Sequence, residues 1–346
     1  MNFPHLPRRK APFPGAQRLS PSQSAPSPTR SALPRRAALL CLTFYLFTGS
    51  QVAVTVEDKS PEVASFTVSP VPPSAIRFCA QEIDLTRYNM YEGMDRELSS
   101  FTYFHSSTLL LFKRANRIFP IIEPILREYG IPEDFKYLAA IESHLDPRAV
   151  SPARAVGLWQ LMEATGKQYG LRITTTVDER RNIEKSTQAA CKYLREAYQK
   201  YGDWVTVAIS YNAGMGRISD EIEKQREASA LNLYLVEETS RYPYRIFAAK
   251  LIFENPYKYG FILKAENLYS RIDCEAVEVS QDINDLVEFA RKYDITFNDL
   301  KYFNPWLKEA KLQTGGGKYT LLIPDKNKIY YQTPNTYVHD TRWVNR

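Results

Sequence analysis

Glu142 is the carboxylate whose surroundings in this sequence best fit acid–base chemistry. A helix is expected from Pro132 to the Asp146-Pro147 pair, and on it Phe135, Leu138 and Glu142 fall at i, i+3 and i+7, on one face. That face is apolar, so the carboxyl group is expected among core residues. Burial disfavours the charged form, raises the pKa of a carboxyl group and lets it hold a proton near neutral pH. A surface position is the commoner one for a lone glutamate, so the neighbouring segments decide the interpretation.

Three separate segments support a catalytic interpretation. The pair Glu142-Ser143 is followed by AVGLWQLM at 155–162 and by SYNAG at 210–214. In this order the segments resemble the catalytic domain of the soluble-lytic-transglycosylase family, above all its membrane-bound type D branch. The resemblance spans about residues 105–262. Several segments in the right order are far more specific than any one short motif.

The resemblance implies a mainly α, lysozyme-like domain with one catalytic carboxylic acid, at the position of Glu142. The substrate implied is peptidoglycan, cleaved between N-acetylmuramic acid and N-acetylglucosamine. Glu142 would protonate the glycosidic oxygen and then accept the proton of the C6 hydroxyl, which attacks C1 and closes a 1,6-anhydro ring. No water is consumed and no cofactor or second protein carboxylate is needed, unlike the usual two-carboxylate arrangement of glycoside hydrolysis.

Six further residues are expected at the substrate. The amide of Gln160 offers a donor and an acceptor to a sugar acetamido group or to Glu142. The set also includes tyrosines that place hydroxyl groups near Glu142, an inward-facing asparagine and a serine beside the acid. A glycine allows a sugar to approach the chain. These residues are Ser143, Gly157, Gln160, Tyr211, Asn212 and Tyr242.

The elements that must position these residues are helical. Apolar residues recur at helical spacing from 108 to about 261, with helices expected at 158–169, 185–201, 204–212 and 242–253. No strands alternate with them, which argues against a doubly wound sheet. We therefore expect a mainly α protein with its catalytic domain at 105–265.

A second, smaller unit follows at 274–326. Strand-like segments at 276–279 and 319–323 enclose helical patterns at 283–292 and 300–303, which predicts a small α+β (βααβ) module. It resembles a lysin-motif (LysM) domain, a fold that binds N-acetylglucosamine polymers. Ile283-Asn284 replaces the usual Gly-Asp, so a degenerate spacer is as consistent as a glycan-binding module. A tail at 327–346 ends the chain.

The N-terminal part carries most of the positive charge. Residues 1–36 contain seven Lys and Arg and no acid, so the rest of a chain with formal charge +6 is close to neutral, which argues against nucleic-acid binding. The apolar stretch at 37–47 that follows is typical of a signal peptide or an N-terminal anchor within a leader at 1–53. A linker or N-terminal extension is expected at 54–104. This predicts an exported protein of the periplasm or cell envelope and leaves membrane attachment open.

Other chemistries find less support. The four histidines are scattered and no Cys pair has zinc spacing, so no metal site is expected. A disulfide among Cys79, Cys191 and Cys274 stays open, as do protein partners. Two alternatives remain: a muramidase similar to goose-type lysozyme, which would need Glu163 or Asp178 to activate water, and a non-catalytic cell-wall-binding protein.

Overall fold

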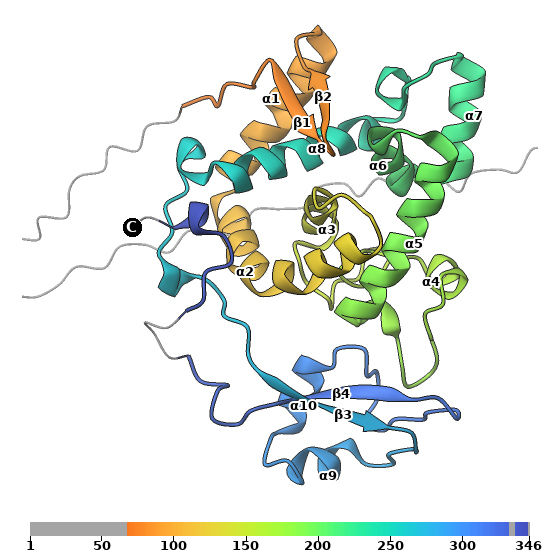
Figure 1. Ribbon diagram of the computed structural model, residues 1–346, viewed down its shortest axis with the longest axis vertical. Coiled ribbons are helices and arrows are strands. Elements are labelled where there is room, and N and C mark those ends of the chain that lie inside the picture. The colour runs from red at the N-terminus through yellow and green to blue at the C-terminus, as the bar shows by residue number, and fades with distance from the viewer. Residues whose placement is uncertain (1–67, 332–335, 345–346) are drawn as a thin grey trace, which may run out of the picture. The chain divides into compact units, whose positions relative to one another are not determined.

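The computed structural model describes residues 68–331 and 336–344, and within them the fold is mainly helical with a small C-terminal sheet (Figure 1). This confirms the expected fold class. The leader predicted at 1–53 lies outside the described residues. The first elements are the antiparallel strands β1 (Ala75–Phe78) and β2 (Gln81–Asp84), in which Ile76 lies opposite Ile83.

Eight α-helices form the main body. They are α1 (Tyr88–Tyr103), α2 (His105–Glu128), α3 (Phe135–Ser143), α4 (Glu163–Gln168), α5 (Ile183–Tyr201), α6 (Trp204–Ala213), α7 (Met215–Gln225) and α8 (Glu237–Glu254). Short 3-10 turns occur at Glu179–Arg181, Ala230–Asn232, Pro256–Tyr259, Ala265–Asn267 and Thr341–Trp343. Helix α3 packs against both α2 and α8, so the end of α3 is held by helices that are distant in sequence.

Helix α3 is shorter than the sequence predicted. It begins at Phe135, and the Asp134 carboxylate before it does not cap the helix but accepts hydrogen bonds from the Cys79 backbone and from Lys250 Nζ, both at 2.7 Å. It ends at Ser143 because His144 takes a left-handed conformation, with φ of 52°, and donates its backbone N–H to the Ala140 carbonyl. The chain therefore turns away directly after Glu142-Ser143.

Four other segments differ from expectation. Helix α1 occupies part of the stretch expected as a linker or extension, and α7 had no predicted counterpart. Helix α2 continues through Pro120 and Pro124, because the buried side chains of this segment, including Phe119 and Ile122, offset the lost backbone hydrogen bonds. Where a helix was expected from residue 158, residues 157–160 form a turn, with Gln160 at φ of 47°, and Leu161 pairs with Val156.

The C-terminal tail packs into the core of the helical body. Trp343 is 3% exposed, its ring packs against Phe112, Phe119 and Phe253, and its indole nitrogen donates to the Phe253 carbonyl at 2.9 Å. Asn116 also holds the tail through the backbone of His339, at 2.8 Å. The last described residues therefore contribute to the same core as α2 and α8.

The small module consists of β3 (Cys274–Val279), α9 (Leu286–Arg291), α10 (Phe297–Phe303) and β4 (Tyr319–Pro324). The strands are antiparallel, with Val277 opposite Leu321, and Leu286 and Leu300 fill the module's own core. This core also takes in Val177 from the loop before α5, which is completely buried there. The module and the helical body thus share apolar packing.

Two further observations concern the described residues. None of their helices combines the length and apolar character that crossing a bilayer requires. Cys79, Cys191 and Cys274 are all free thiols, so the disulfide left open by the sequence is not formed here.

We predict that Trp343→Ala lowers the free energy of unfolding by about 3–5 kcal/mol, because the large cavity left behind is lined by aromatic rings that cannot collapse. Urea unfolding followed by circular dichroism measures the loss. Tyr337→Ala is the matched control, since that side chain is 66% exposed and its removal is expected to change stability by less than about 0.5 kcal/mol. Equal effects of the two substitutions would contradict a structural role for the tail.

Candidate active site

Glu142 lies in the last turn of α3, half-buried, with its carboxyl group against α8. Its Oε1 accepts a hydrogen bond of 2.5 Å from the Tyr242 hydroxyl of α8. Burial raises the pKa of the Glu142 carboxyl, and this effect outweighs the Tyr242 hydrogen bond and the positive charge of Arg245, which both act to lower it. A carboxyl group with a raised pKa beside one fixed donor is suited to holding and exchanging a proton.

Two tyrosines surround this carboxyl group in different ways. Tyr242 donates to Glu142 directly, whereas Tyr211 donates its hydroxyl to the Trp159 carbonyl at 2.7 Å. Burial is the main cause that raises the pKa of both phenols, and the nearby negative charge of Glu142 is the next cause in each case. Both hydroxyls therefore stay protonated, and each has a single hydrogen to donate in a hydrogen bond.

Ser143 and Gly157 hold the loop that follows α3. The Ser143 hydroxyl is buried and donates to the Leu158 carbonyl at 2.8 Å, so it ties the end of α3 to the loop. Gly157 has φ of 86°, and a Cβ atom there would lie 1.9 Å from the Arg180 carbonyl oxygen. The close approach that Gly157 permits in the structure is to the chain itself, and approach to a sugar stays a prediction.

Gln160 and Asn212 are placed by local hydrogen bonds. The Gln160 amide nitrogen donates to the Gly157 carbonyl at 2.8 Å and to that of Ala149 at 3.3 Å. Asn212, near the end of α6, accepts a hydrogen bond of 3.0 Å from the Thr239 hydroxyl at the start of α8. Among the described residues neither makes a hydrogen bond with Glu142, so their contact with substrate stays a prediction.

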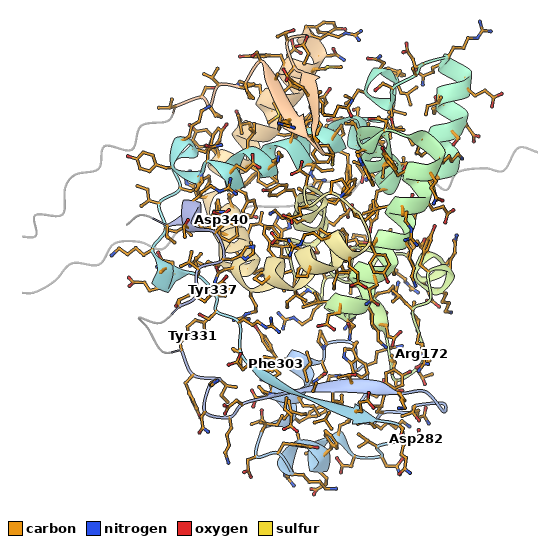
Figure 2. The ribbon with its side chains drawn as sticks, viewed as in Figure 1. Arg172, Asp282, Phe303, Tyr331, Tyr337 and Asp340 are labelled. Atoms are coloured by element: carbon orange, nitrogen blue, oxygen red, sulfur yellow. The ribbon has the colours of Figure 1, made fainter. Side chains whose placement is uncertain are left out.

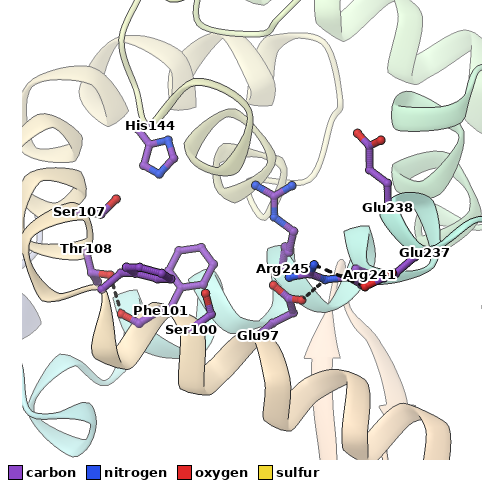
Figure 3. A pocket seen from close by; sticks show the side chains of 11 residues that line it. Glu97, Ser100, Phe101, Ser107, Thr108, His144, Glu237, Glu238, Arg241 and Arg245 are labelled. Atoms are coloured by element: carbon purple, nitrogen blue, oxygen red, sulfur yellow. Dashed lines mark hydrogen bonds and ion pairs between the residues drawn. The ribbon is translucent and has the colours of Figure 1, made fainter. Parts of the chain in front are cut away.

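A cleft of about 700 Å³ lies near Glu142, to which His144, Glu238 and Arg245 connect it (Figure 3). Glu142 itself and the six predicted substrate residues are not among the residues that line this cleft. Helices α1, α2 and α8 and the residue after α3 contribute its lining, which includes Phe101, His144, Glu238, Arg241 and Arg245. Figure 3 shows these charged side chains gathered on the α8 side and the aromatic ring of Phe101 opposite. A cleft with an apolar wall and charged donors fits a polar ligand with apolar faces, such as a sugar chain.

Two charged residues of this cleft, Glu238 and Arg245, were not among the predicted site residues. Arg245 donates to the Ile141 carbonyl at 3.2 Å and its charge lowers the pKa of Glu142, while the charge of Glu238 raises it. The signal was present in the sequence, because 238, 242 and 245 are spaced as one face of a helix. Of these three residues, only Tyr242 was predicted as a site residue.

The loop at 154–161 is fixed from behind by a buried ion pair. The Arg180 guanidinium and the Asp178 carboxylate are 7% and 8% exposed and share two hydrogen bonds, of 2.9 and 2.8 Å. The third nitrogen of Arg180 donates to the carbonyls of Leu161, at 3.2 Å, and Arg154, at 3.3 Å. The ion pair is itself tied to the small module, because the Asp178 backbone donates to the Trp306 carbonyl at 2.8 Å.

The two acids considered for water activation have other partners. Glu163 is exposed on α4, where its hydrogen bond with Lys167 lowers the pKa of its carboxyl group. Asp178 is engaged by Arg180. The structure describes no contact of either acid with Glu142. In the described part of the chain no group of His, Cys, Asp and Glu could hold a metal ion.

Comparison with known proteins identifies two domains in this chain. Residues 119–233 match the transglycosylase SLT domain, and residues 275–327 match the soluble lytic transglycosylase C-terminal LysM-like domain. The chain therefore carries an SLT transglycosylase domain followed by a LysM-like SLT C-terminal domain, as the motifs indicated.

The chain is homologous to membrane-bound lytic murein transglycosylase D of Escherichia coli (strain K12). The two are 29% identical over 241 residues, 68% of this chain and 52% of that protein, so the chain spans about half the relative's length. Membrane-bound lytic murein transglycosylase F of Serratia proteamaculans (strain 568) is 31% identical over 134 residues, covering 36% of this chain and 26% of that protein. Among solved structures, the 70 kDa soluble lytic transglycosylase SLT70 of Escherichia coli matches 41% of this chain and 24% of its own, with 21% identity and a TM-score of 0.34.

Tyr242→Phe is expected to raise the pKa of Glu142 further. The hydroxyl stabilises the charged carboxylate, so its removal leaves burial less opposed and favours the protonated form. Carbon-13 NMR titration of labelled glutamate side chains measures the change, with the Glu142 signal assigned by its loss in Glu142→Gln. Tyr201→Phe removes a hydroxyl that bonds to the Met215 carbonyl and should leave this pKa unchanged. An unchanged or lowered pKa in Tyr242→Phe contradicts the prediction.

Asp178→Asn is expected to destabilise the fold by about 3–5 kcal/mol, because it leaves the Arg180 guanidinium buried without a counter-charge. Thermal and urea unfolding measure the loss. Glu163→Gln breaks the exposed pair with Lys167 and serves as control, with an expected cost much smaller than that of Asp178→Asn because solvent screens an exposed pair. If Asp178→Asn costs no more than the control, the buried pair does not hold this loop.

Proposed function

We propose that this protein is a peptidoglycan lytic transglycosylase that cleaves the β-1,4 bond between N-acetylmuramic acid and N-acetylglucosamine without water. The observation that carries the proposal is the Glu142 carboxyl group, which is hydrogen-bonded to Tyr242, has a raised pKa, and lies close to Glu238 and Arg245 of a cleft of about 700 Å³. The SLT domain match and the relatives named above support the same assignment.

In this proposal Glu142 serves first as acid and then as base. Tyr242 occupies Oε1, which leaves Oε2 to carry the proton to the glycosidic oxygen of the leaving sugar. The carboxylate formed is stabilised by the Tyr242 hydroxyl and by the charge of Arg245, and it then takes the proton of the C6 hydroxyl. Protonation breaks the bond between C1 and the glycosidic oxygen, and the leaving sugar departs with that proton. The C6 oxygen then bonds to C1 and closes the 1,6-anhydro ring, and its proton returns Glu142 to the acid form.

The remaining residues are assigned supporting roles. Ser143 and Tyr211 hold the carbonyls at 158 and 159 and thereby keep the loop against α3. Gln160 lies in that loop with an amide oxygen available to a sugar acetamido group, and Asn212 keeps its amide nitrogen available while its oxygen is bonded to Thr239. Gly157 lets the loop approach Arg180 closely.

A hydrolase is the second candidate function, because a second carboxylate lies near Glu142. Glu238 lines the cleft and lies near enough to raise the pKa of Glu142, whereas Glu163 and Asp178 are engaged elsewhere. If Glu238 activated water, the enzyme would use two carboxylates as glycoside hydrolases do. The two reactions differ in their products and can be separated directly.

We propose that the protein acts in the periplasm or cell envelope. The basic and apolar leader expected from the sequence and the names of the homologues, which are membrane-bound lytic murein transglycosylases, support this location. Peptidoglycan strands are the proposed partner.

Digestion of purified peptidoglycan followed by mass spectrometry of the chain ends tests the function. We expect 1,6-anhydro ends, and we expect Glu142→Gln to reduce their rate of formation at least about 100-fold because the proton donor is lost. Glu238→Gln is the matched control and should still form anhydro ends. Reducing ends with water added, lost in Glu238→Gln, would favour the hydrolase; unchanged activity of Glu142→Gln would exclude this acid.

A further inference from the structure

The cleft of about 700 Å³ near Glu142 has two ends of different character. The end at α8 carries charged side chains, which are Glu237, Glu238, Arg241 and Arg245, with Glu97 of α1 beside them. The other end combines hydroxyl groups with aromatic rings, from Ser107, Thr108, Phe101 and Phe104. Figure 3 shows His144 at this second end, on the side of Ser107. The residue that follows the pair Glu142-Ser143 therefore enters the cleft where an uncharged part of a ligand would lie.

His144 keeps an unfavourable backbone conformation that its side chain does not need for packing. Its φ of 52° lies in the left-handed region, which glycine and asparagine adopt more readily. Leu145 shares this conformation, with φ of 56°, but its side chain is 1% exposed and its burial offsets the strain. The His144 side chain is exposed to the cleft instead. Strain without compensating packing is typical of residues held in place for function.

His144 also differs from the other histidines of the described residues. His105 packs its ring against two other aromatic rings. His339, next to the Asp340 labelled in Figure 2, bonds to Glu123 at 3.1 Å. In the part of the chain that the structure describes, His144 takes part in hydrogen bonds only through its backbone. Both imidazole nitrogens are therefore available to a ligand.

The surroundings of His144 favour its neutral form. Burial is the main cause that lowers the pKa of this imidazole, and the positive charges of Arg245 and Arg114 lower it further. Both arginines are held close, because Arg114 donates to the His144 carbonyl at 2.8 Å and Arg245 donates to the Ile141 carbonyl at 3.2 Å. At neutral pH one imidazole nitrogen is thus a donor and the other is an acceptor.

Acidic groups also surround His144, but most of them are engaged. They are Glu142 on α3, Asp146 after it, Glu97 on α1, and Glu237 and Glu238 on α8. Asp146 pairs with Arg114 at 3.2 Å, and Glu97 pairs with Arg241 at 2.6 Å. The pKa of Glu142 is raised, which favours its uncharged form. These acids therefore do not reverse the effect of the two arginines on His144.

We infer that His144 is a substrate-binding residue whose neutral imidazole accepts a hydrogen bond from the sugar bound next to Glu142, an inference that rests on the proposed function. A pyranose ring has apolar faces and carries hydroxyl and acetamido N–H donors at its edge. The ring of Phe101 can cover a face, and His144 can accept from the edge. A protonated His144 has no acceptor, so substrate binding weakens at acidic pH.

This role predicts opposite titrations for two neighbouring groups. Glu142 must be protonated to act as an acid, so kcat/KM falls as the pH rises through its raised pKa. His144 must be neutral to accept a hydrogen bond, so kcat/KM falls as the pH drops through its pKa, which lies below 6.5. We therefore expect a bell-shaped pH profile of kcat/KM whose acidic limb belongs to His144.

Two variants of the full chain test this assignment on soluble glycan strands. His144→Leu removes the acceptor and is expected to raise KM about fivefold at neutral pH, with a smaller change in kcat. His144→Gln keeps a donor and an acceptor but does not titrate, so its KM should be lower than that of His144→Leu and should not rise at acidic pH. Both variants have the same left-handed backbone to maintain, so the difference between them reports the polar groups of the side chain.

His105→Gln is the matched control, because His105 is an exposed histidine that does not line this cleft. It should keep both the KM and the acidic limb of the wild type. A wild-type KM in His144→Leu, or an acidic limb that persists in His144→Gln, would overturn the proposal. A limb that persists there and disappears in Glu238→Gln would assign it to the water-activating carboxylate of the hydrolase instead.

Binding without turnover separates this inference from the proposed function. The full chain with Glu142→Gln is titrated with a tetrasaccharide of alternating N-acetylglucosamine and N-acetylmuramic acid, and the imidazole signals are followed by NMR. We expect the His144 signal to shift and its pKa to fall further when the sugar is bound, because the sugar binds the neutral form. The signal is specific to His144 even if the C-terminal module also binds the sugar. Absence of anhydro ends would refute the proposed function, whereas an imidazole that does not respond would refute only the role of His144.

Discussion

The burial of one carboxyl group at the end of a helix is the constraint on which the rest of the site depends. A buried carboxylate is costly unless it is paired or hydrogen-bonded, and Glu142 has one donor, Tyr242, which is 100 residues away in sequence. The packing of α3 against α8 therefore sets the protonation behaviour of the acid. A shift of α8 by a fraction of a turn would separate the hydroxyl from the carboxyl group and leave the charge unsupported.

The loop behind the acid depends on a second chain of contacts that extends to the C-terminal module. Ser143 fixes the loop to α3, Arg180 fixes it from behind, and Asp178 joins Arg180 to the module backbone. Val177 adds an apolar anchor, since it lies in the module's core. The module thus contributes packing and hydrogen bonds to the segment that carries Gln160, whatever glycan affinity it has of its own.

Sequence patterns predicted the helices that carry the site better than the loop and the hydrogen bonds that join them. The face shared by Leu138 and Glu142 followed from helical spacing, and helices at 185–201 and 204–212 were found within a few residues of their bounds. The loop after α3 was not predictable, because His144, Arg154 and Gln160 all take positive φ angles that their residue types do not signal. Nor could spacing reveal that the Tyr211 hydroxyl bonds to a backbone carbonyl, since this depends on tertiary packing.

Helix α8 supplies both a group that raises the pKa of Glu142 and groups that lower it. On α8, Glu238 raises the pKa of Glu142, whereas Tyr242 and Arg245 lower it, and all three residues lie on one face. In the proposed mechanism Glu142 first gives and then takes a proton. A strongly lowered pKa would leave no proton to donate and a strongly raised one would leave no base, so the mechanism needs an intermediate pKa. Placing the opposing groups on a single rigid helix fixes their balance, since they cannot move relative to one another. Burial raises the pKa of Glu142, and the groups on α8 adjust it from that raised value.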